Sequence, residues 1–238
     1  MRRRFFTLFA ILGLTAAPLA AKAGAAETDL VRSVMQQTTK LQPAVLERAL
    51  AAYRCAMREQ LVERPGLLTL IDYAKPSTEP RLWVLDLDRG RVLYEELVAH
   101  GRNTGELFAT AFSNVPESKQ SSIGVFRTGA TYFGKHGLSL RLDGLEPGVN
   151  DKARDRAIVM HGADYVSERF VERQGRLGRS WGCPAVRREI ARPLINLLSG
   201  GSLIFAHYPD SNWLANSEFL NGCGASRVAQ NDERRPAG

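Results

Sequence analysis

The stretch RLWVLDLDRGRVLYEELVAHG, residues 81–101, has the pattern of two β-strands joined by a tight turn. Apolar and polar residues alternate on both sides of Asp88-Arg89-Gly90, and this period is typical of a strand with one buried face. Aspartate and glycine between two such runs are typical of a hairpin turn. The stretch therefore predicts a β-hairpin.

Short apolar runs separated by turn-rich stretches continue along the chain. They predict further strands at residues 123–127, 138–142, 157–162 and 202–208. Apolar residues at steps of three and four predict two amphipathic helices, at 41–63 and 187–198. This strand-dominated succession favours a mainly β fold with flanking helices (α+β) over a doubly wound α/β fold. We expect a mixed β sandwich or barrel-like sheet with an N-terminal helical annex.

The N-terminus has the pattern of an export signal. Residues 1–23 place three arginines before an apolar run and small residues after it. Pro18 within the run and the lack of a basic stop favour cleavage over a retained N-terminal anchor, which is the alternative. The arginines also resemble a twin-arginine signal, so the export route stays open. We expect an exported protein of the periplasm or cell envelope.

The remaining chain is expected to form a helical segment at 24–75, a main domain at 76–215 and a polar tail at 216–238. The formal net charge of +7 falls to +3 when the four basic residues of the signal are removed. No large basic excess is then left for nucleic acid, and no second apolar stretch of membrane-spanning length follows. We expect a monomer without nucleic-acid partners and without a membrane anchor after signal cleavage.

The three cysteines of the chain are Cys55, Cys183 and Cys223. An odd number in an exported protein predicts one disulfide and one free thiol. Cys55 and Cys223 lie in the flanks of the sequence, whereas Cys183 lies in the unusual glycine-bearing stretch GRLGRSWGCPAV, residues 175–186. We expect a Cys55–Cys223 disulfide and a free thiol at Cys183.

Cys183 has neighbours that suit a nucleophile. Gly182 permits close backbone approach, and Pro184 precedes a predicted helix whose positive end would favour a thiolate. The N–H groups of Gly182 and Cys183 are candidates to bind an oxyanion. A base is also needed, and the chain offers four histidines: His100, His136, His161 and His207. His161 is the best placed, because it ends the apolar strand AIVMHG.

These residues form a pattern that resembles a known family. His161-Gly162 is followed, after the eighteen residues 162–179, by Ser180-Trp181-Gly182-Cys183. This arrangement resembles the active-site signature of the L,D-transpeptidases, the YkuD-like catalytic domain. SSIGVFRT at 121–128 and GGSLIFAHY at 200–208 are similar to supporting segments of that family. The resemblance spans roughly residues 81–208.

Two positions depart from the usual family pattern. Trp181 stands where histidine is common, and Ala185 stands where arginine or asparagine is common. The sequence is similar to a divergent Ser-x-Gly-Cys-Pro subfamily, and Arg187 or Arg188 is the candidate replacement for the missing basic residue.

The resemblance implies a cysteine-dependent acyl transfer on peptidoglycan stem peptides, without a cofactor or metal. Cys183 would attack the carbonyl after the third residue of a tetrapeptide stem, with His161 as the proton carrier. Ser180 and Gly182 are further candidate catalytic residues, and Tyr132, His136, Trp181 and Arg187 are candidate substrate contacts. An amine acceptor would complete transpeptidation, and water would instead give an L,D-carboxypeptidase.

Two other classes remain as alternatives. Cys183, Cys223, His161 and His136 could ligate zinc, although the chain has no C-x-x-C or H-x-x-x-H pair. The other alternative is a catalytically silent envelope-binding protein of the same fold. The departures from the family pattern at Trp181 and Ala185 suggest this alternative.

Overall fold

The structure is a computed structural model that describes residues 19–223. Residues 1–18 of the expected export signal and residues 224–238 of the expected tail lie outside the described residues. The elements are α1 (Leu19–Met35), α2 (Pro43–Arg58), β1 (Leu67–Asp72), β2 (Leu82–Asp86), β3 (Arg91–Glu96), β4 (Gly124–Gly134), β5 (Gly137–Gly144), β6 (Val159–Gly162), α3 (Glu168–Gln174), β7 (Ala185–Val186), α4 (Arg188–Leu198), β8 (Leu203–His207), α5 (Ser211–Asn216) and the π-helix η1 (Glu218–Gly222).

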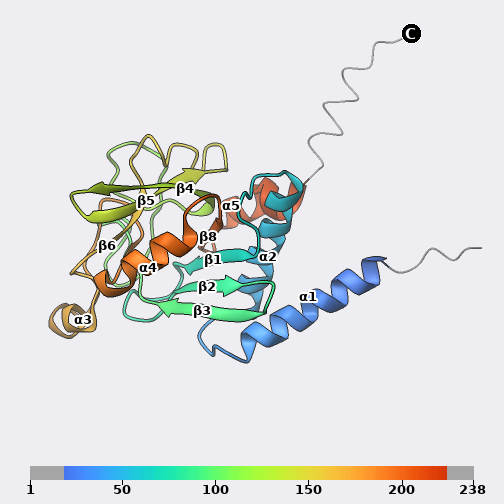
Figure 1. Cartoon of the computed structure of the whole chain (residues 1–238). Coiled ribbons are helices and arrows are strands. Elements are labelled where there is room, and N and C mark those ends of the chain that lie inside the picture. The colour runs from blue at the N-terminus through green and yellow to red at the C-terminus, as the bar shows by residue number, and fades with distance from the viewer. Residues whose placement is uncertain (1–18, 224–238) are drawn as a thin grey trace, which may run out of the picture.

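The strands form one mixed sheet in the order β3-β2-β1-β8-β4-β5-β6-β7. Two neighbouring pairs, β1–β8 and β6–β7, are parallel, and the other neighbours are antiparallel. In Figure 1, β1–β3 occupy the lower half of the sheet and β4–β5 the upper half, with α4 in front of them. The predicted fold class, a mainly β fold with a mixed, nearly barrel-like sheet and flanking helices, is confirmed.

The two hairpins differ in how far the sequence predicts them. The hairpin expected at 81–101 is β2–β3, and the Asp86 carboxylate accepts a hydrogen bond from the N–H of Arg89 in its turn. The strands expected at 123–127 and 138–142 are the buried parts of β4 and β5, which continue to a tip at residues 135 and 136. Near the tip both faces are largely exposed, so the apolar pattern ends there while the strand pairing continues.

The helical segment expected at 24–75 is shorter than predicted. α1 and α2 are helical, but β1 lies in the middle of the sheet between β2 and β8. Five of its six residues are buried, so the strand shows no apolar–polar alternation by which it could be separated from a buried helix. The main domain therefore includes β1.

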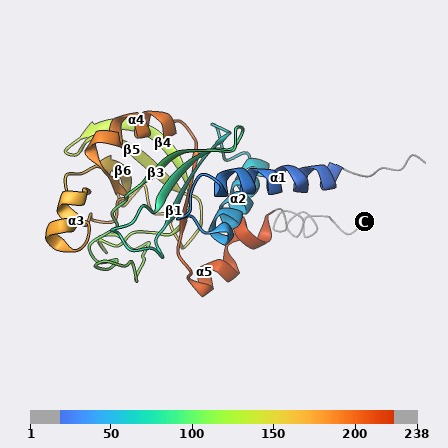
Figure 2. The same cartoon turned by 90° about the horizontal axis from the view of Figure 1, so that it is seen from below.

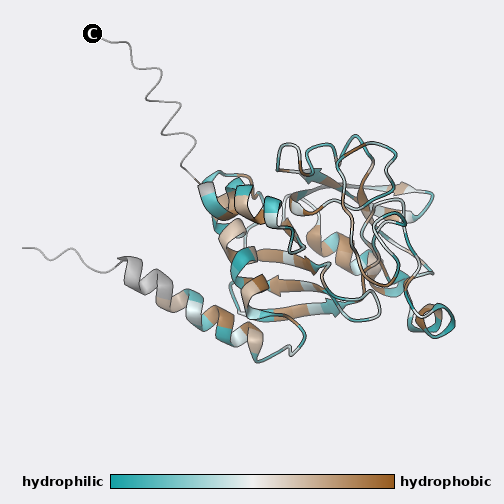
Figure 3. Cartoon of the chain, turned by 180° about the vertical axis from the view of Figure 1, so that it is seen from behind, coloured by the Kyte–Doolittle hydropathy of each residue, from teal (hydrophilic) through white to brown (hydrophobic). Residues whose placement is uncertain are grey.

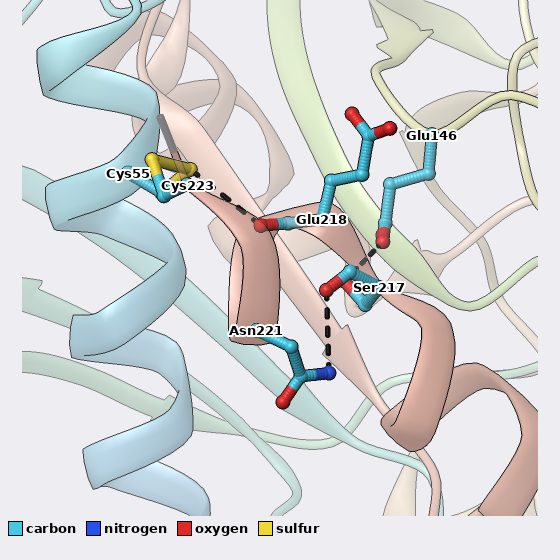
Figure 4. The surroundings of a disulfide bond; sticks show 6 residues. All are labelled: Cys55, Glu146, Ser217, Glu218, Asn221 and Cys223. Carbon is cyan, nitrogen blue, oxygen red and sulfur yellow. Dashed lines mark hydrogen bonds between the residues drawn. A yellow bond between two sulfur atoms is a disulfide. The ribbon is translucent and has the colours of Figure 1, made fainter. Parts of the chain in front are cut away.

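A disulfide fastens the C-terminal segment to α2. It joins Cys55 to Cys223, the pair expected from the sequence, as Figure 4 shows. The segment before Cys223 is also docked by packing, because Phe219 is buried and the Ser217 hydroxyl donates a hydrogen bond to the buried Glu146 carboxylate. The expected polar tail therefore contains an ordered part up to residue 223.

The helices cover the sheet unevenly. Figure 2 shows α1, α2 and α5 at one end of the molecule and α3 at the other. In Figure 3 the central strands are mostly brown, whereas the coloured part of α1 shows both teal and brown. Within residues 19–223, no helix combines the length and the apolar character needed to cross a membrane. A small apolar cluster separate from the main core includes Leu177 and Ala185, which flank Cys183 in the sequence.

Candidate active site

One cavity contains both Cys183 and His161. Its volume is about 470 Å³. It is lined by Tyr132, Gly134, Lys135, His136, Ser139, Arg156, Ala157, Val159, His161, Tyr165, Arg179, Ser180, Trp181 and Cys183. The lining residues come from the tip of the β4–β5 hairpin, from β6 with the residues before it, and from the segment that precedes β7.

The pairing of β6 with β7 brings the sulfur and the imidazole to this cavity. His161 is the partner of Ala185 in the parallel register, so Cys183 lies opposite Val159. The Val159 N–H donates a hydrogen bond of 3.4 Å to the Cys183 sulfur. Residues two apart on a strand face the same side. His161 therefore projects on the side of β6 from which Val159 lines the cavity.

His161 is held as a neutral base. Its Nδ1 lies 3.0 Å from the carbonyl oxygen of Gly162, and a carbonyl can only accept, so Nδ1 carries the proton and Nε2 has the free lone pair. Burial lowers the pKa of His161 to about 4, with smaller contributions from the nearby charges of Lys135 and Arg188. The His136 ring stacks on it at 4.3 Å between centroids. The imidazole is thus unprotonated at neutral pH and free to accept a proton.

Cys183 is the free thiol, and its pKa differs from the sequence expectation. Burial raises the pKa, and this effect outweighs the Val159 hydrogen bond and the charges of Arg156 and Lys135, which lower it. The expected help of a helix is absent, because β7 follows Cys183 and α4 begins only at Arg188. In the resting state the cavity therefore contains a thiol and a neutral imidazole rather than a thiolate and an imidazolium.

This assignment predicts the pH dependence of alkylation. The rate at which iodoacetamide alkylates Cys183 is expected to keep rising at a pH where the rate in urea-unfolded protein has levelled off. The reason is that the folded state raises the thiol pKa, so the thiolate fraction at a given pH is smaller. A profile of rate against pH for both states measures it. A plateau at lower pH in the folded protein would mean a preformed thiolate–imidazolium pair.

The turn before Cys183 is closed by Ser180. The Ser180 hydroxyl donates to the Cys183 carbonyl at 2.7 Å and accepts from the Gly182 N–H at 3.0 Å. The Ser121 hydroxyl donates to the Gly182 carbonyl at 3.0 Å. The Gly182 N–H is thus engaged within the turn, contrary to the expectation that it is available for an oxyanion. The Cys183 N–H has no hydrogen-bond acceptor among residues 19–223 and remains the candidate.

Gly182 is required by its geometry, and this predicts the effect of a substitution. Its φ is +121°, and an added Cβ would lie 2.7 Å from the Gln120 carbonyl oxygen. Gly182→Ala is expected to cost about 3 kcal/mol of unfolding free energy and to slow Cys183 alkylation, because the turn must shift. Gly175→Ala is the matched control, with φ +68° and no neighbouring atom within 4 Å. It is expected to cost about 1 kcal/mol without affecting alkylation. Equal losses of stability in urea titrations would contradict the steric argument.

Three of the four expected substrate contacts line the cavity: Tyr132, His136 and Trp181. Arg187 does not, which corrects the sequence expectation. Its guanidinium forms two hydrogen bonds, of 2.9 and 2.7 Å, with the nearly buried Glu96 carboxylate on β3. Arg188 pairs with Asp164. Arg187 and Arg188 thus each form an ion pair with a carboxylate of the protein, at the start of α4.

Sequence reasoning missed several residues of the cavity. Arg156, Tyr165 and Arg179 line it. Arg156 was recognisable by one signal, because it lies just before the strand that ends in His161. The others become neighbours of Cys183 only through the fold, since they lie in segments without a chemical motif.

The zinc alternative does not fit this arrangement. Cys223 is bonded to Cys55, so it cannot join the other three expected ligands. Across residues 19–223, no group of three or more His, Cys, Asp or Glu side chains is placed to hold a metal ion.

The chain matches a family model described as the L,D-transpeptidase catalytic domain over residues 37–207. The matched region begins well before the expected residue 81 and includes α2 and β1. No match was found among curated proteins.

Solved structures of similar fold have low sequence identity. An L,D-transpeptidase from Mycobacterium smegmatis is 16% identical with a TM-score of 0.37, over 60% of this chain and 59% of that one. The helical cell shape determining protein Pgp2 from Campylobacter jejuni is 10% identical with a TM-score of 0.41, over 68% and 56%. An L,D-transpeptidase (Yku) from Stackebrandtia nassauensis is 12% identical with a TM-score of 0.36, over 76% and 90%. The chain thus spans less than two thirds of the first two proteins.

Proposed function

Because this chain belongs to the L,D-transpeptidase catalytic domain family, we propose that it is an exported peptidoglycan L,D-transpeptidase with Cys183 as nucleophile. The observation that carries the proposal is the shared cavity, which is lined both by a free thiol and by an imidazole that is neutral at physiological pH. A hydrolytic or transfer reaction through a thioester needs these two groups and no metal.

The first half of the reaction forms an acyl-enzyme. His161 Nε2 accepts the Cys183 proton as the sulfur attacks the carbonyl after the third residue of a tetrapeptide stem. The Cys183 N–H faces the oxyanion of the tetrahedral intermediate. His161 then donates the proton to the amine of the departing D-alanine, the C–N bond breaks, and a thioester remains on Cys183.

The second half transfers the acyl group. An amine of a neighbouring stem attacks the thioester, and His161 accepts one of its protons. The C–S bond breaks, a new amide cross-link forms, and the proton returns to the sulfur. The Gly162 carbonyl accepts a hydrogen bond from His161 Nδ1–H in both protonation states of the imidazole, so it keeps the ring oriented through both halves of the reaction.

Export of this chain is part of the proposal. The signal-like pattern at 1–23 and the Cys55–Cys223 disulfide both suit a compartment outside the cytosol. The peptidoglycan substrate is found in the same compartment.

Mass spectrometry of muropeptides tests the proposal. The mature protein is incubated with purified tetrapeptide stems, with and without an amine acceptor. The masses of the stems and of the intact protein are then measured. Loss of D-alanine, a thioester adduct on the protein and stems cross-linked through third-position residues are expected. Tripeptide alone would mean that water is the acceptor and the enzyme is a carboxypeptidase. Unchanged stems and unmodified protein would favour the silent scaffold.

A further inference from the structure

The cavity around Cys183 has a one-sided charge. Its lining includes three cationic side chains, Lys135, Arg156 and Arg179, and no aspartate or glutamate. A cavity with this composition attracts anions and disfavours cations. The cavity can bind an anion only through a cation that has no carboxylate partner in the protein. The partners of each cation therefore decide which side chain could bind it.

The two arginines are largely committed to the protein. The Arg156 guanidinium donates to the carbonyls of Ser113 and Gln120 and to the hydroxyls of Ser118 and Ser122. Arg179 pairs with the Glu106 carboxylate at 2.6 Å. Arg156 thus directs four of its five donors at neutral groups of the protein, and Arg179 shares the Glu106 carboxylate with Arg176, so neither guanidinium is held free for an incoming anion.

Two lysines remain, and they meet at Trp181. The Lys135 ammonium lies 5.2 Å from the centroid of the indole ring, and the Lys119 ammonium lies 5.1 Å from it. Lys119 comes from the loop before β4, and Lys135 comes from the β4–β5 tip. Neither has a carboxylate partner within residues 19–223. Trp181 itself is 63% exposed, so the group stands open at the mouth of the cavity.

Two ammonium groups on one ring repel each other unless an anion lies near them. The face of an indole attracts a cation by about 1 kcal/mol at an exposed site, which holds each lysine close but neutralises neither. A carboxylate that approached this edge would interact with both charges. Trp181 thus holds two cations at the mouth of the cavity, and one of them, Lys135, also lines the cavity that contains Cys183.

We propose that Lys119 and Lys135, held on the Trp181 ring, form a carboxylate-binding site that positions a free carboxylate of the stem peptide beside Cys183. This inference rests on the proposed function for the identity of the substrate, but the charge preference of the site does not. Trp181 occupies a position where histidine is common in the L,D-transpeptidase family. In this proposal, Trp181 holds two lysines that come from segments outside the active-site motif, and these lysines bind the carboxylate.

The first experiment measures charge preference without turnover. Cys183 is the free thiol, so its alkylation rates with iodoacetate, which carries a carboxylate, and with neutral iodoacetamide can be compared directly. The ratio of the two rates cancels any change in thiolate fraction. The ratio is expected to be higher in the folded protein than in urea, and to fall about threefold in Lys135→Gln and again in Lys119→Gln.

Matched variants separate charge from structure. Lys135→Arg keeps the charge and is expected to keep the ratio, and Lys152→Gln removes an exposed lysine outside the cavity and is expected to change nothing. Raising the salt concentration is expected to lower the ratio in the wild type more than in the double Lys→Gln variant. An unchanged ratio in both Lys→Gln variants would overturn the inference, whatever the enzyme does with muropeptides.

The second experiment identifies which stem carries the carboxylate. In a donor titration, Lys135→Gln is expected to raise KM with little change in kcat if the donor stem is bound there. If the acceptor stem is bound there, the rise is expected in the acceptor titration instead. A fall in kcat alone, in both titrations, would contradict carboxylate binding. A protein with no turnover but a charge-dependent alkylation ratio would refute the proposed function and leave the anion site standing.

Discussion

Cys183→Ala is expected to abolish acyl-enzyme formation, with a loss of turnover of at least about 10⁴-fold. The thioester requires the sulfur, and within residues 19–223 no other cysteine has a free thiol. The variant is expected to fold as the wild type does, because alanine removes one atom from a residue that is only partly buried. Intact-protein mass spectrometry after incubation with tetrapeptide stems measures the effect.

His161→Gln separates the roles of the pair. Glutamine keeps polar atoms but accepts no proton at neutral pH, so a loss of about 10³-fold or more is expected. The double variant is expected to be no worse than Cys183→Ala, because the two residues act as one unit. Lys152→Gln is the control on the same fold. Appreciable thioester formation in His161→Gln would mean that the sulfur is ionised by its surroundings rather than by the imidazole.

Removal of the disulfide is expected to give the largest effect on stability. Cys55 and Cys223 are 168 residues apart, so their link restricts nearly the whole folded chain in the unfolded state. The chain-entropy estimate for such a loop is about 5 kcal/mol. For a domain of this size the loss corresponds to a fall in Tm of roughly 10–20 °C. Thermal unfolding of the Cys55→Ala, Cys223→Ala double variant measures it.

The same variant is expected to retain the active site at temperatures where it stays folded. The disulfide joins α2 to the residue after η1, and Figure 2 places α2 and α5 at the end of the molecule opposite α3. The rate of Cys183 alkylation at low temperature is therefore expected to match that of the wild type. Reduction of the disulfide in the wild type is the control. A fall in the Tm of the double variant much smaller than roughly 10–20 °C would mean that buried contacts such as those of Phe219 hold the C-terminal segment without the disulfide.

The strands with one buried face were predictable from the chain alone, whereas β1 was not. The β2–β3 hairpin follows from alternation on both sides of a turn, and both signals lie within the hairpin itself. β1 is buried on both faces, so its pattern does not distinguish a strand from a helix. Its place between β2 and β8 depends on pairing with a strand more than 130 residues later in the sequence.

The sequence indicated that Cys183 and His161 share a site, but it did not indicate the surroundings of the two residues. The spacing of His161 and Cys183 is a local pattern that a resemblance can detect. The direction of the Cys183 pKa is not local, because it results from burial by several segments that outweighs the nearby cations. The position of Arg187 outside the cavity is not local either, since Glu96, which binds it, lies on β3.

By itself the sequence determined the strand-rich class, the candidate cysteine–histidine pair and the cysteines of the disulfide. The strand class and the candidate pair follow from the period and spacing of residues, and the disulfide pair follows from the number and positions of the three cysteines. Only the tertiary structure decided which charges surround the sulfur and which N–H groups are free. Lys119 and Lys135 come from separate segments and meet on Trp181 only because the sheet brings their segments together, and that convergence leaves no trace in local sequence.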